Sequence, residues 1–236
     1  MRNAVEAPPG RRGLSSFAAV RRWVADETWL KRLLTARRWM SRAYFEARYL
    51  VADPWRVATS PYERARARAS VEVLEGRPYA SALEVGCGEG LFTSRLLDRC
   101  GHVVAVDFSA LAIRRARRRF AGEPRVEVER LDVRTTELDR TFDLVFCAEL
   151  FYYMNSAEFE EVGARLVRWL APGGDLCLVH GTSVHDAEPG AEGTGQMSAR
   201  RIHDRFRRMP GLVVLRDLAL PRYRVTLLRR TEAGGA

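Results

Sequence analysis

From residue 80 onward the chain alternates short apolar runs with segments of helical character. The runs SALEV, HVVAVD, FDLVFCAEL and DLCLVHG are apolar at almost every position, and VEVERLD, after the second of them, alternates in polarity. Strands that are apolar throughout are typical of a parallel sheet whose two faces are both covered by helices. The sequence therefore predicts an α/β fold built on a mostly parallel sheet.

Local sequence signals indicate where the helix after the fourth apolar run begins and ends. Asn155 is a good helix N-cap, and Glu158 lies three positions later, where it can complete a capping box. The predicted helix ends at the Pro/Gly stop LAPGG. The last apolar runs, GLVVLRDLAL and RYRVTLLRR, are joined around Pro221, and we expect them to form an antiparallel pair of strands.

The chain before residue 76 divides into two parts. Residues 1–13 are rich in Pro, Gly and Arg and are expected to be disordered. Residues 14–75 are expected to form a helical arm or lid, because apolar residues recur at helical spacing and a second helix follows a break at Asp53-Pro54. Residues 76–236 then form the main domain.

Positive charge is concentrated in the arm. The formal net charge is +9, and residues 1–50 contain eleven Arg or Lys against four Asp or Glu. Aromatic residues interleave with these arginines, which would suit stacking on a nucleic acid. The favoured interpretation is an amphipathic helix that packs on the domain or on a partner subunit, with its arginines solvated. A homodimer through the arm is therefore expected, and nucleic acid is disfavoured as a partner.

The remaining composition excludes several classes of protein. No apolar run reaches the ~18 residues of a membrane span. The four cysteines form neither a C-x-x-C pair nor a metal-ligand spacing. We expect reduced, structural thiols, a cytoplasmic protein and no metal site.

The segment LEVGCGEG follows the first predicted strand and contains Gly86, Gly88 and Gly90. Its spacing, G-x-G-x-G, differs from the G-x-G-x-x-G fingerprint of dinucleotide binding. Asp107 ends the second strand about 20 residues on, where a carboxylate can accept both ribose hydroxyls. Asp132 ends the third strand, where a carboxylate can accept the exocyclic amine of adenine. Together they predict a site for an adenosine moiety.

Glu84 indicates what the adenosine carries. A dinucleotide would place its pyrophosphate beside this carboxylate, which is unfavourable. S-adenosylmethionine instead carries a sulfonium and an ammonium group, which Glu84 can attract, and a carboxylate, which backbone N–H groups of the glycine loop can bind. Cys87 is interpreted as a small residue beside this cofactor. A nicotinamide-dependent reductase is disfavoured for the same reasons.

The motifs LEVGCGEG, VDFS, RLDV and FDLVFCAELFYY resemble, in this order, those of the class I S-adenosylmethionine-dependent methyltransferases. More narrowly, DPWRVATSPYERARA and AELFYYM resemble the N-methyltransferase family of rhizobial nodulation-factor synthesis, and the likeness covers residues 50–180. It implies a Rossmann-like, mostly parallel sheet of seven strands, and methyl transfer. In that family the Asp-Pro-Trp and Tyr-Glu segments precede the cofactor strand, and the resemblance implies that the matching residues close the pocket here: Asp53, Pro54, Trp55, Tyr62 and Glu63. The resemblance adds these residues to the expected cofactor site: Trp55, Tyr62, Phe108, Val133, Ala148 and Glu149.

Candidates for the acceptor site follow the fourth and fifth strands. Tyr152 and Tyr153 could orient an amine or hydroxyl of the acceptor, or pack beneath the arm. His180 is the best candidate for a base, because the pKa of histidine is close to the working pH; a structural role is the alternative. A base is needed only if the acceptor must lose a proton. His185 lies in a predicted loop that could close over the substrate.

These features favour a methyltransferase that acts on an amine or hydroxyl of a small molecule, such as a sugar or a natural-product intermediate. The main alternative is an RNA methyltransferase that uses the basic arm, and a further one is a non-catalytic partner of a methyltransferase. The Asn/Asp-Pro-Pro-aromatic loop common in enzymes that methylate base nitrogens is replaced here by AELFYYM. No role is predicted for His102 or His203.

Overall fold

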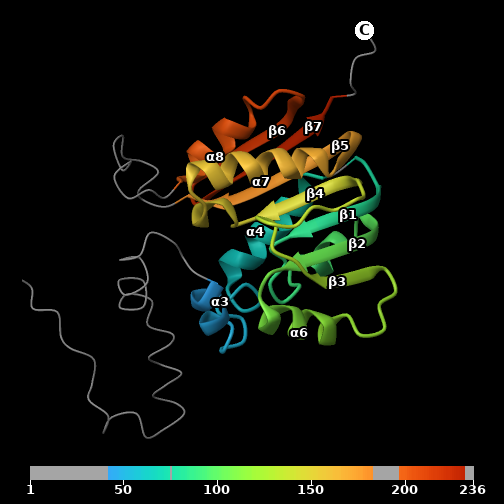
Figure 1. Cartoon of the computed structure of the whole chain (residues 1–236), viewed down its shortest axis with the longest axis vertical. Coiled ribbons are helices and arrows are strands. Elements are labelled where there is room, and N and C mark those ends of the chain that lie inside the picture. Colours follow the sequence, from blue (N-terminus) through green and yellow to red (C-terminus); the bar gives the residue numbers. More distant parts are fainter. Residues whose placement is uncertain (1–41, 75, 183–196, 232–236) are drawn as a thin grey trace, which may run out of the picture.

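The computed structural model describes residues 42–74, 76–182 and 197–231 (Figure 1). The predictions for the tail at residues 1–13, for most of the arm, for dimerisation through the arm and for His185 concern residues outside these ranges.

One sheet of seven strands forms the centre of the described residues. Its order is β3-β2-β1-β4-β5-β7-β6, with β7 antiparallel to both of its neighbours and the other pairs parallel. The predicted seven-stranded, mostly parallel sheet and its closing antiparallel pair are confirmed. The strands are β1 (Tyr79–Val85), β2 (Cys100–Asp107), β3 (Val126–Arg130), β4 (Phe142–Ala148), β5 (Leu170–Gly181), β6 (Leu212–Leu220) and β7 (Tyr223–Arg230).

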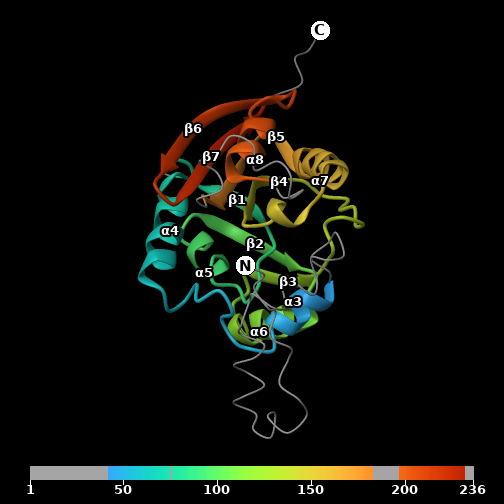
Figure 2. The ribbon, with the colours of Figure 1, turned by 90° about the vertical axis from the view of Figure 1, so that its left-hand side faces the viewer.

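Helices cover both faces of the sheet, and Figure 2 shows α4 and α5 on one side and α7 and α8 on the other. The arrangement follows from the alternation of side chains along each strand. In β4, Leu144 and Phe146 pack with α4 and α5, whereas Val145 and Cys147 pack with α7 and α8. The helices are α3 (Arg42–Arg48), α4 (Pro61–Glu72), α5 (Thr93–Leu96), α6 (Ala110–Arg119), the short 3₁₀ turn η1 (Phe151–Tyr153), α7 (Ser156–Arg168) and α8 (Ala199–Phe206).

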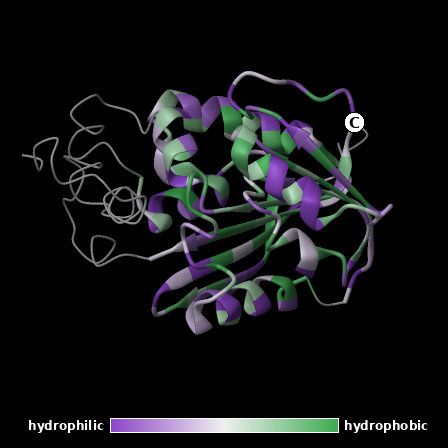
Figure 3. Cartoon of the chain, turned by 90° about the horizontal axis from the view of Figure 1, so that it is seen from below, coloured by the Kyte–Doolittle hydropathy of each residue, from purple (hydrophilic) through white to green (hydrophobic). Residues whose placement is uncertain are grey.

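The central strands β1, β2, β4 and β5 carry buried hydrophobic residues on both faces. In Figure 3 much of the sheet is green, and the helices that cover it carry purple residues outward. Local signals place the helices that cover them. Asn155 caps α7 through the predicted capping box with Glu158. The predicted end of the helix at LAPGG is confirmed, because α7 ends at Arg168 with Trp169 as its C-cap. The strand β5 begins earlier than predicted, since it includes these five residues, and its register against β4 is irregular at this point.

The order of the sheet reverses between β1 and β4. The chain leaves β1 toward α5 on one face, and it leaves β4 toward α7 on the other. The loops at the carboxyl ends of these two strands therefore diverge and open a crevice, which is where open α/β sheets bind ligands. Figure 1 shows α3 beside this edge of the sheet.

No helix among the described residues is both long and apolar enough to cross a bilayer. Within the same residues, no group of three or more His, Cys, Asp or Glu is arranged to hold a metal ion.

Candidate active site

A cavity of about 250 Å³ lies at the carboxyl ends of β1, β2 and β4. Its walls also come from α3, from the segment at residues 53–57 and from α4. The structure thus brings together residues that are up to about 100 positions apart in the chain. The predicted site residues that line it are Trp55, Glu84, Gly86, Cys87, Gly88, Asp107, Phe108, Asp132, Val133, Ala148, Glu149 and Tyr153.

The N–H groups of the glycine loop are used within the protein. Those of Gly86 and Cys87 both donate to the carbonyl of Val106, at 2.8 and 2.9 Å. The N–H of Gly88 donates to Asp107 Oδ2 at 3.0 Å, and that of Gly90 returns to the loop at the carbonyl of Cys87. The N–H groups of these three glycines hold the loop in its own shape, and binding of the cofactor's carboxylate by backbone N–H groups of the loop stays a prediction.

Two of the glycines are required by close neighbours. Gly88 has a φ of +55°, and a Cβ there would lie 2.7 Å from the Tyr49 hydroxyl. Gly90 has a φ of +76°, and its Cβ would lie 2.5 Å from the ring of Phe120. Side chains other than glycine are strained in this left-handed region. Gly90 is not part of the cavity wall, so its role is in the packing of the loop against α6.

Burial raises the pKa of both carboxyl groups beside the loop. The pKa of Glu84 rises to about 8, although Thr93 Oγ1 donates a hydrogen bond to it. The pKa of Asp107 rises to about 6, opposed by the N–H groups of Ser109 and Gly88, which donate to its two oxygens at 2.8 and 3.0 Å. Each Asp107 oxygen accepts one of these bonds and has a second lone pair left for a ligand hydroxyl.

Asp132 is paired with arginine. Arg134 donates Nε to Oδ1 at 2.9 Å and Nη2 to Oδ2 at 2.8 Å, and Arg42 donates to Oδ2 at 3.1 Å. These bonds, led by that from Arg134, lower the pKa of Asp132 to about 2. The guanidinium groups of Arg42 and Arg134 each lie 5.7 Å from the ring centre of Phe108. An adenine amine would take the place of Arg42, the more exposed of the two arginines.

Aromatic rings form part of the cavity wall. The ring of Phe45, in α3, lies 5.4 Å from Phe108 and 4.8 Å from Tyr153, in both cases edge to face. Trp55 packs against Tyr49 at 5.1 Å. Helix α3 is held there because its Glu46 accepts hydrogen bonds from residues 109–111 at the start of α6.

The segment at residues 53–57 is fastened to the glycine loop by Glu89. This carboxylate accepts the N–H of Asp53 at 3.1 Å and pairs with Arg115 of α6 at 2.7 Å. Asp53 in turn accepts the N–H of Val57 at 2.6 Å. The Asp-Pro-Trp motif thus forms a compact turn that presents Trp55 to the cavity.

Arg66 was not singled out by the sequence, yet it is the most buried cation in the cavity wall, at 5% exposed. Its Nη2 lies 2.5 Å from Glu63 Oε2 and its Nη1 lies 2.8 Å from Glu149 Oε1. Glu149 Oε1 also accepts the N–H of Gly181 at 2.6 Å. Burial raises the pKa of Glu63 and of Glu149, opposed in each case by Arg66.

Two predicted tyrosines lie outside the cavity wall. The hydroxyl of Tyr62 donates to the carbonyl of Arg222 at 2.9 Å, and its ring packs 6.0 Å from Tyr223, so it ties α4 to the start of β7. The hydroxyl of Tyr152 donates to the carbonyl of Gly181. Both tyrosines therefore contribute to the structure around the cavity and do not line it.

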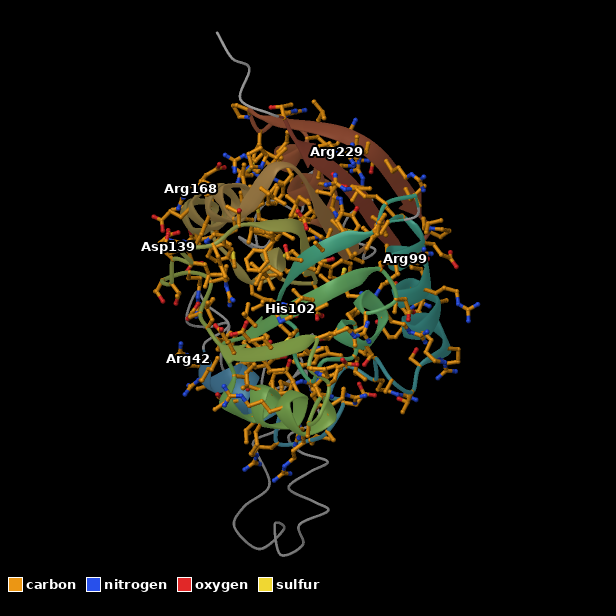
Figure 4. The ribbon with its side chains drawn as sticks, turned by 90° about the vertical axis from the view of Figure 1, so that its right-hand side faces the viewer. Arg42, Arg99, His102, Asp139, Arg168 and Arg229 are labelled. Carbon is orange, nitrogen blue, oxygen red and sulfur yellow. The ribbon has the colours of Figure 1, made fainter. Side chains whose placement is uncertain are left out.

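His180 ends β5 as predicted, but it does not line the cavity. Its side chain is fully buried, and its Nδ1 lies 3.1 Å from Nε2 of His203, whose Nδ1 lies 2.5 Å from Thr226 Oγ1. Thr226 donates its proton to Asp217, so it accepts from His203 Nδ1–H, and His203 Nε2 accepts from His180 Nδ1–H. The histidines form a neutral structural pair, which sequence alone did not indicate. His102 lies at the start of β2, away from the cavity (Figure 4).

The histidine pair is expected to make stability depend on pH. Burial, with Arg224 nearby, lowers the pKa of His203 to about 3. The unfolded chain takes up this proton near pH 6.5, so the free energy of unfolding falls as the pH drops from about 6.5 to 3, by up to about 1.4 kcal/mol per pH unit for each buried histidine. Urea denaturation of the wild type and H203Q across this range measures it. Their stability difference should shrink toward low pH, and a constant difference would contradict the assignment; H102Q is the matched control.

The order of the sheet and a cavity with these carboxylates at the switch point are those of a Rossmann-like fold with a ligand site at its carboxyl edge. Residues 82–174 match a family model described as a methyltransferase domain.

Three known proteins are similar to this chain in sequence or in structure. Nodulation protein S of Rhizobium tropici is 39% identical over 126 residues, which cover 52% of this chain and 53% of that protein. Phosphoethanolamine N-methyltransferase 1 of Triticum aestivum is 36% identical over 103 residues, or 42% of this chain and 20% of that protein. The structure of the N-methyltransferase NodS from Bradyrhizobium japonicum WM9 in complex with S-adenosyl-L-homocysteine matches with a TM-score of 0.71 at 22% identity, covering 81% of this chain and 98% of that one.

The predicted resemblance to the nodulation-factor N-methyltransferases is confirmed by these matches. The chain spans between about half and two thirds of the length of the nodulation proteins that it matches.

Proposed function

We propose that this protein is an S-adenosylmethionine-dependent N-methyltransferase that acts on a small molecule. The observation that carries the proposal is the cavity at the carboxyl ends of β1, β2 and β4, into which Glu84, Asp107 and Asp132 are brought together. The names of the relatives favour nitrogen as the methylated atom, since both the NodS structure and the wheat protein are N-methyltransferases.

The residues around the cavity fit the adenosine part of the cofactor. Asp107 would accept the ribose hydroxyls with its remaining lone pairs, and Asp132 would accept the adenine amine. Phe108 and Val133 supply an apolar wall for the base. Glu84 and the backbone near Ala148 would lie by the methionine end. When bound, this cofactor supplies an electrophilic methyl group on a positively charged sulfur.

Arg66 is the best candidate for holding the cofactor's carboxylate. The N–H groups of the loop glycines are occupied, and Arg66 Nε is buried with no hydrogen-bond partner among the described residues. A carboxylate is the ligand group that would satisfy this donor most strongly. Tyr153, which lines the same cavity, would help to position the acceptor.

Other expectations remain proposals of the same kind. The four cysteines are buried and unpaired, which is typical of a cytoplasmic protein. The division into an arm at residues 14–75 and a domain at residues 76–236 is retained, with α4 packed on the sheet. The RNA alternative rested on the charge of the arm, most of which precedes the described residues.

Calorimetry tests the proposed function. S-adenosylmethionine and S-adenosylhomocysteine should both bind the full chain, and NADH should not. Incubation with a metabolite extract should then yield products that are heavier by one methylene unit. Binding of NADH in place of S-adenosylmethionine would refute the proposal.

A further inference from the structure

Building on the proposed function, we propose that Glu63 and Glu149, joined by Arg66, form the binding site for the acceptor's amino group. The acceptor then enters the cavity as an ammonium ion.

The three side chains form one compact cluster from two separate elements. Glu63 and Arg66 lie one turn apart in α4, and Glu149 follows β4, where its backbone adopts a φ of +56°. Arg66 contacts both carboxylates, at 2.5 and 2.8 Å, and all three residues line the cavity. This cluster therefore forms part of the wall in the region where β4 ends and the methyl group of the cofactor is expected.

Carboxyl groups outnumber guanidinium groups in the lining of the cavity. Two guanidinium groups, of Arg66 and Arg134, contribute to its lining together with seven carboxyl side chains: Asp53, Glu63, Glu84, Glu89, Asp107, Asp132 and Glu149. Asp53 and Glu89 hold the segment at residues 53–57, and Glu84, Asp107 and Asp132 are assigned to the cofactor. S-adenosylmethionine brings only one net positive charge, so Glu63 and Glu149 remain available to a second cation.

Neither the charge nor the hydrogen-bonding capacity of the cluster is fully satisfied by its own three side chains. Arg66 carries one positive charge between two carboxylates, which leaves a net charge of −1 when both are ionised. The ion pair with Arg66 and the hydrogen bond from Gly181 both use Oε1 of Glu149, so its Oε2 can receive a ligand. An ammonium ion brings one charge and three N–H donors, whereas a hydroxyl brings one donor and no charge. Because the cluster is buried, leaving its net negative charge uncompensated is unfavourable, so the site favours an ammonium ion over a hydroxyl.

Glu149 can also free the nitrogen for reaction. One N–H bond of the ammonium ion breaks, its electron pair stays on nitrogen, and a new O–H bond forms on the carboxylate. The amine becomes neutral and nucleophilic, and Glu149 becomes a neutral carboxylic acid. The raised pKa of this carboxyl favours the transfer.

A pair of minimal probes tests the site without turnover. Methylammonium chloride and methanol differ in charge but hardly in size, and saturation-transfer NMR can measure the binding of each to the protein loaded with S-adenosylhomocysteine at constant ionic strength. The wild type should prefer methylammonium by about tenfold or more, and E149Q and E63Q should each lose about tenfold of that preference. E149D, which retains the charge, should restore part of it.

Each outcome bears on the proposal. E72Q removes an exposed carboxylate from the same helix α4 and should leave the preference unchanged. Equal binding of the two probes by the wild type, no binding of methylammonium, or an unchanged preference in E149Q would overturn the site. Binding of S-adenosylhomocysteine by each variant shows that it is folded. If the wild type itself fails to bind S-adenosylhomocysteine, the proposed function fails instead.

Discussion

Replacing Arg66 with methionine is expected to lower the free energy of unfolding by about 2 to 4 kcal/mol. Methionine fills much of the same volume, but it leaves the carboxylates of Glu63 and Glu149 without their counter-charge. Loss of one partner from a fully buried pair costs about 3 to 5 kcal/mol. We expect a somewhat smaller effect because the Glu149 side chain is 34% exposed. Urea denaturation at neutral pH measures the change.

The double variant R66M/E149Q separates the effect of charge on the free energy of unfolding from the effect of side-chain packing. Removing the charge of Glu149 should recover part of the loss, because only the carboxylate of Glu63 then remains without its counter-charge. R68M serves as the control, since Arg68 lies on the exposed side of the same helix, and it should change stability by less than about 0.5 kcal/mol. A cost below about 1 kcal/mol for R66M would mean that the cluster does not fasten α4 to β4.

Replacing Asp107 with alanine is expected to weaken the binding of S-adenosylmethionine by about 1 to 3 kcal/mol. The substitution removes the acceptor of the ribose hydroxyls and also releases the N–H groups of Gly88 and Ser109. Calorimetry measures the affinity, and D139A, at an exposed surface carboxylate (Figure 4), is the control.

The pH dependence of binding gives a second signature of Asp107. Its pKa is raised to about 6, and only the ionised carboxylate can accept from both hydroxyls. Wild-type affinity should therefore fall as the pH is lowered through 6, and D107A should lack this fall. An unchanged affinity in D107A would place the ribose elsewhere.

The fold could be predicted because its signals are local. The central strands are apolar in their own right, β3 alternates in polarity, and the caps of α6 and α7 are made by Ser109 and Asn155 with residues three positions away. The acids at the ends of β1, β2 and β3 could be found for the same reason. They lie within two residues of the carboxyl ends of their strands, and parallel strands bring these ends to one edge.

The cation of the site could not be predicted in this way. Arg66 is one of three arginines in the run ERARARA, and its neighbours Arg64 and Arg68 are exposed. Helix α4 has a weak apolar stripe, so periodicity does not indicate which arginine faces inward. The partner Glu149 lies 83 positions further along the chain, and only the tertiary fold brings the two together. The same holds for His180 and His203, whose pairing depends on how α8 docks against β5.

The hydrogen bond between His180 and His203 has a consequence for the segment between them. It joins the end of β5 to α8, so the chain is held together on both sides of residues 183–196. The entropy of closing a segment between two fixed points rises only slowly with its length. The bond therefore fixes the two ends of this segment relative to each other, and the entropy cost of changing the segment's length is small.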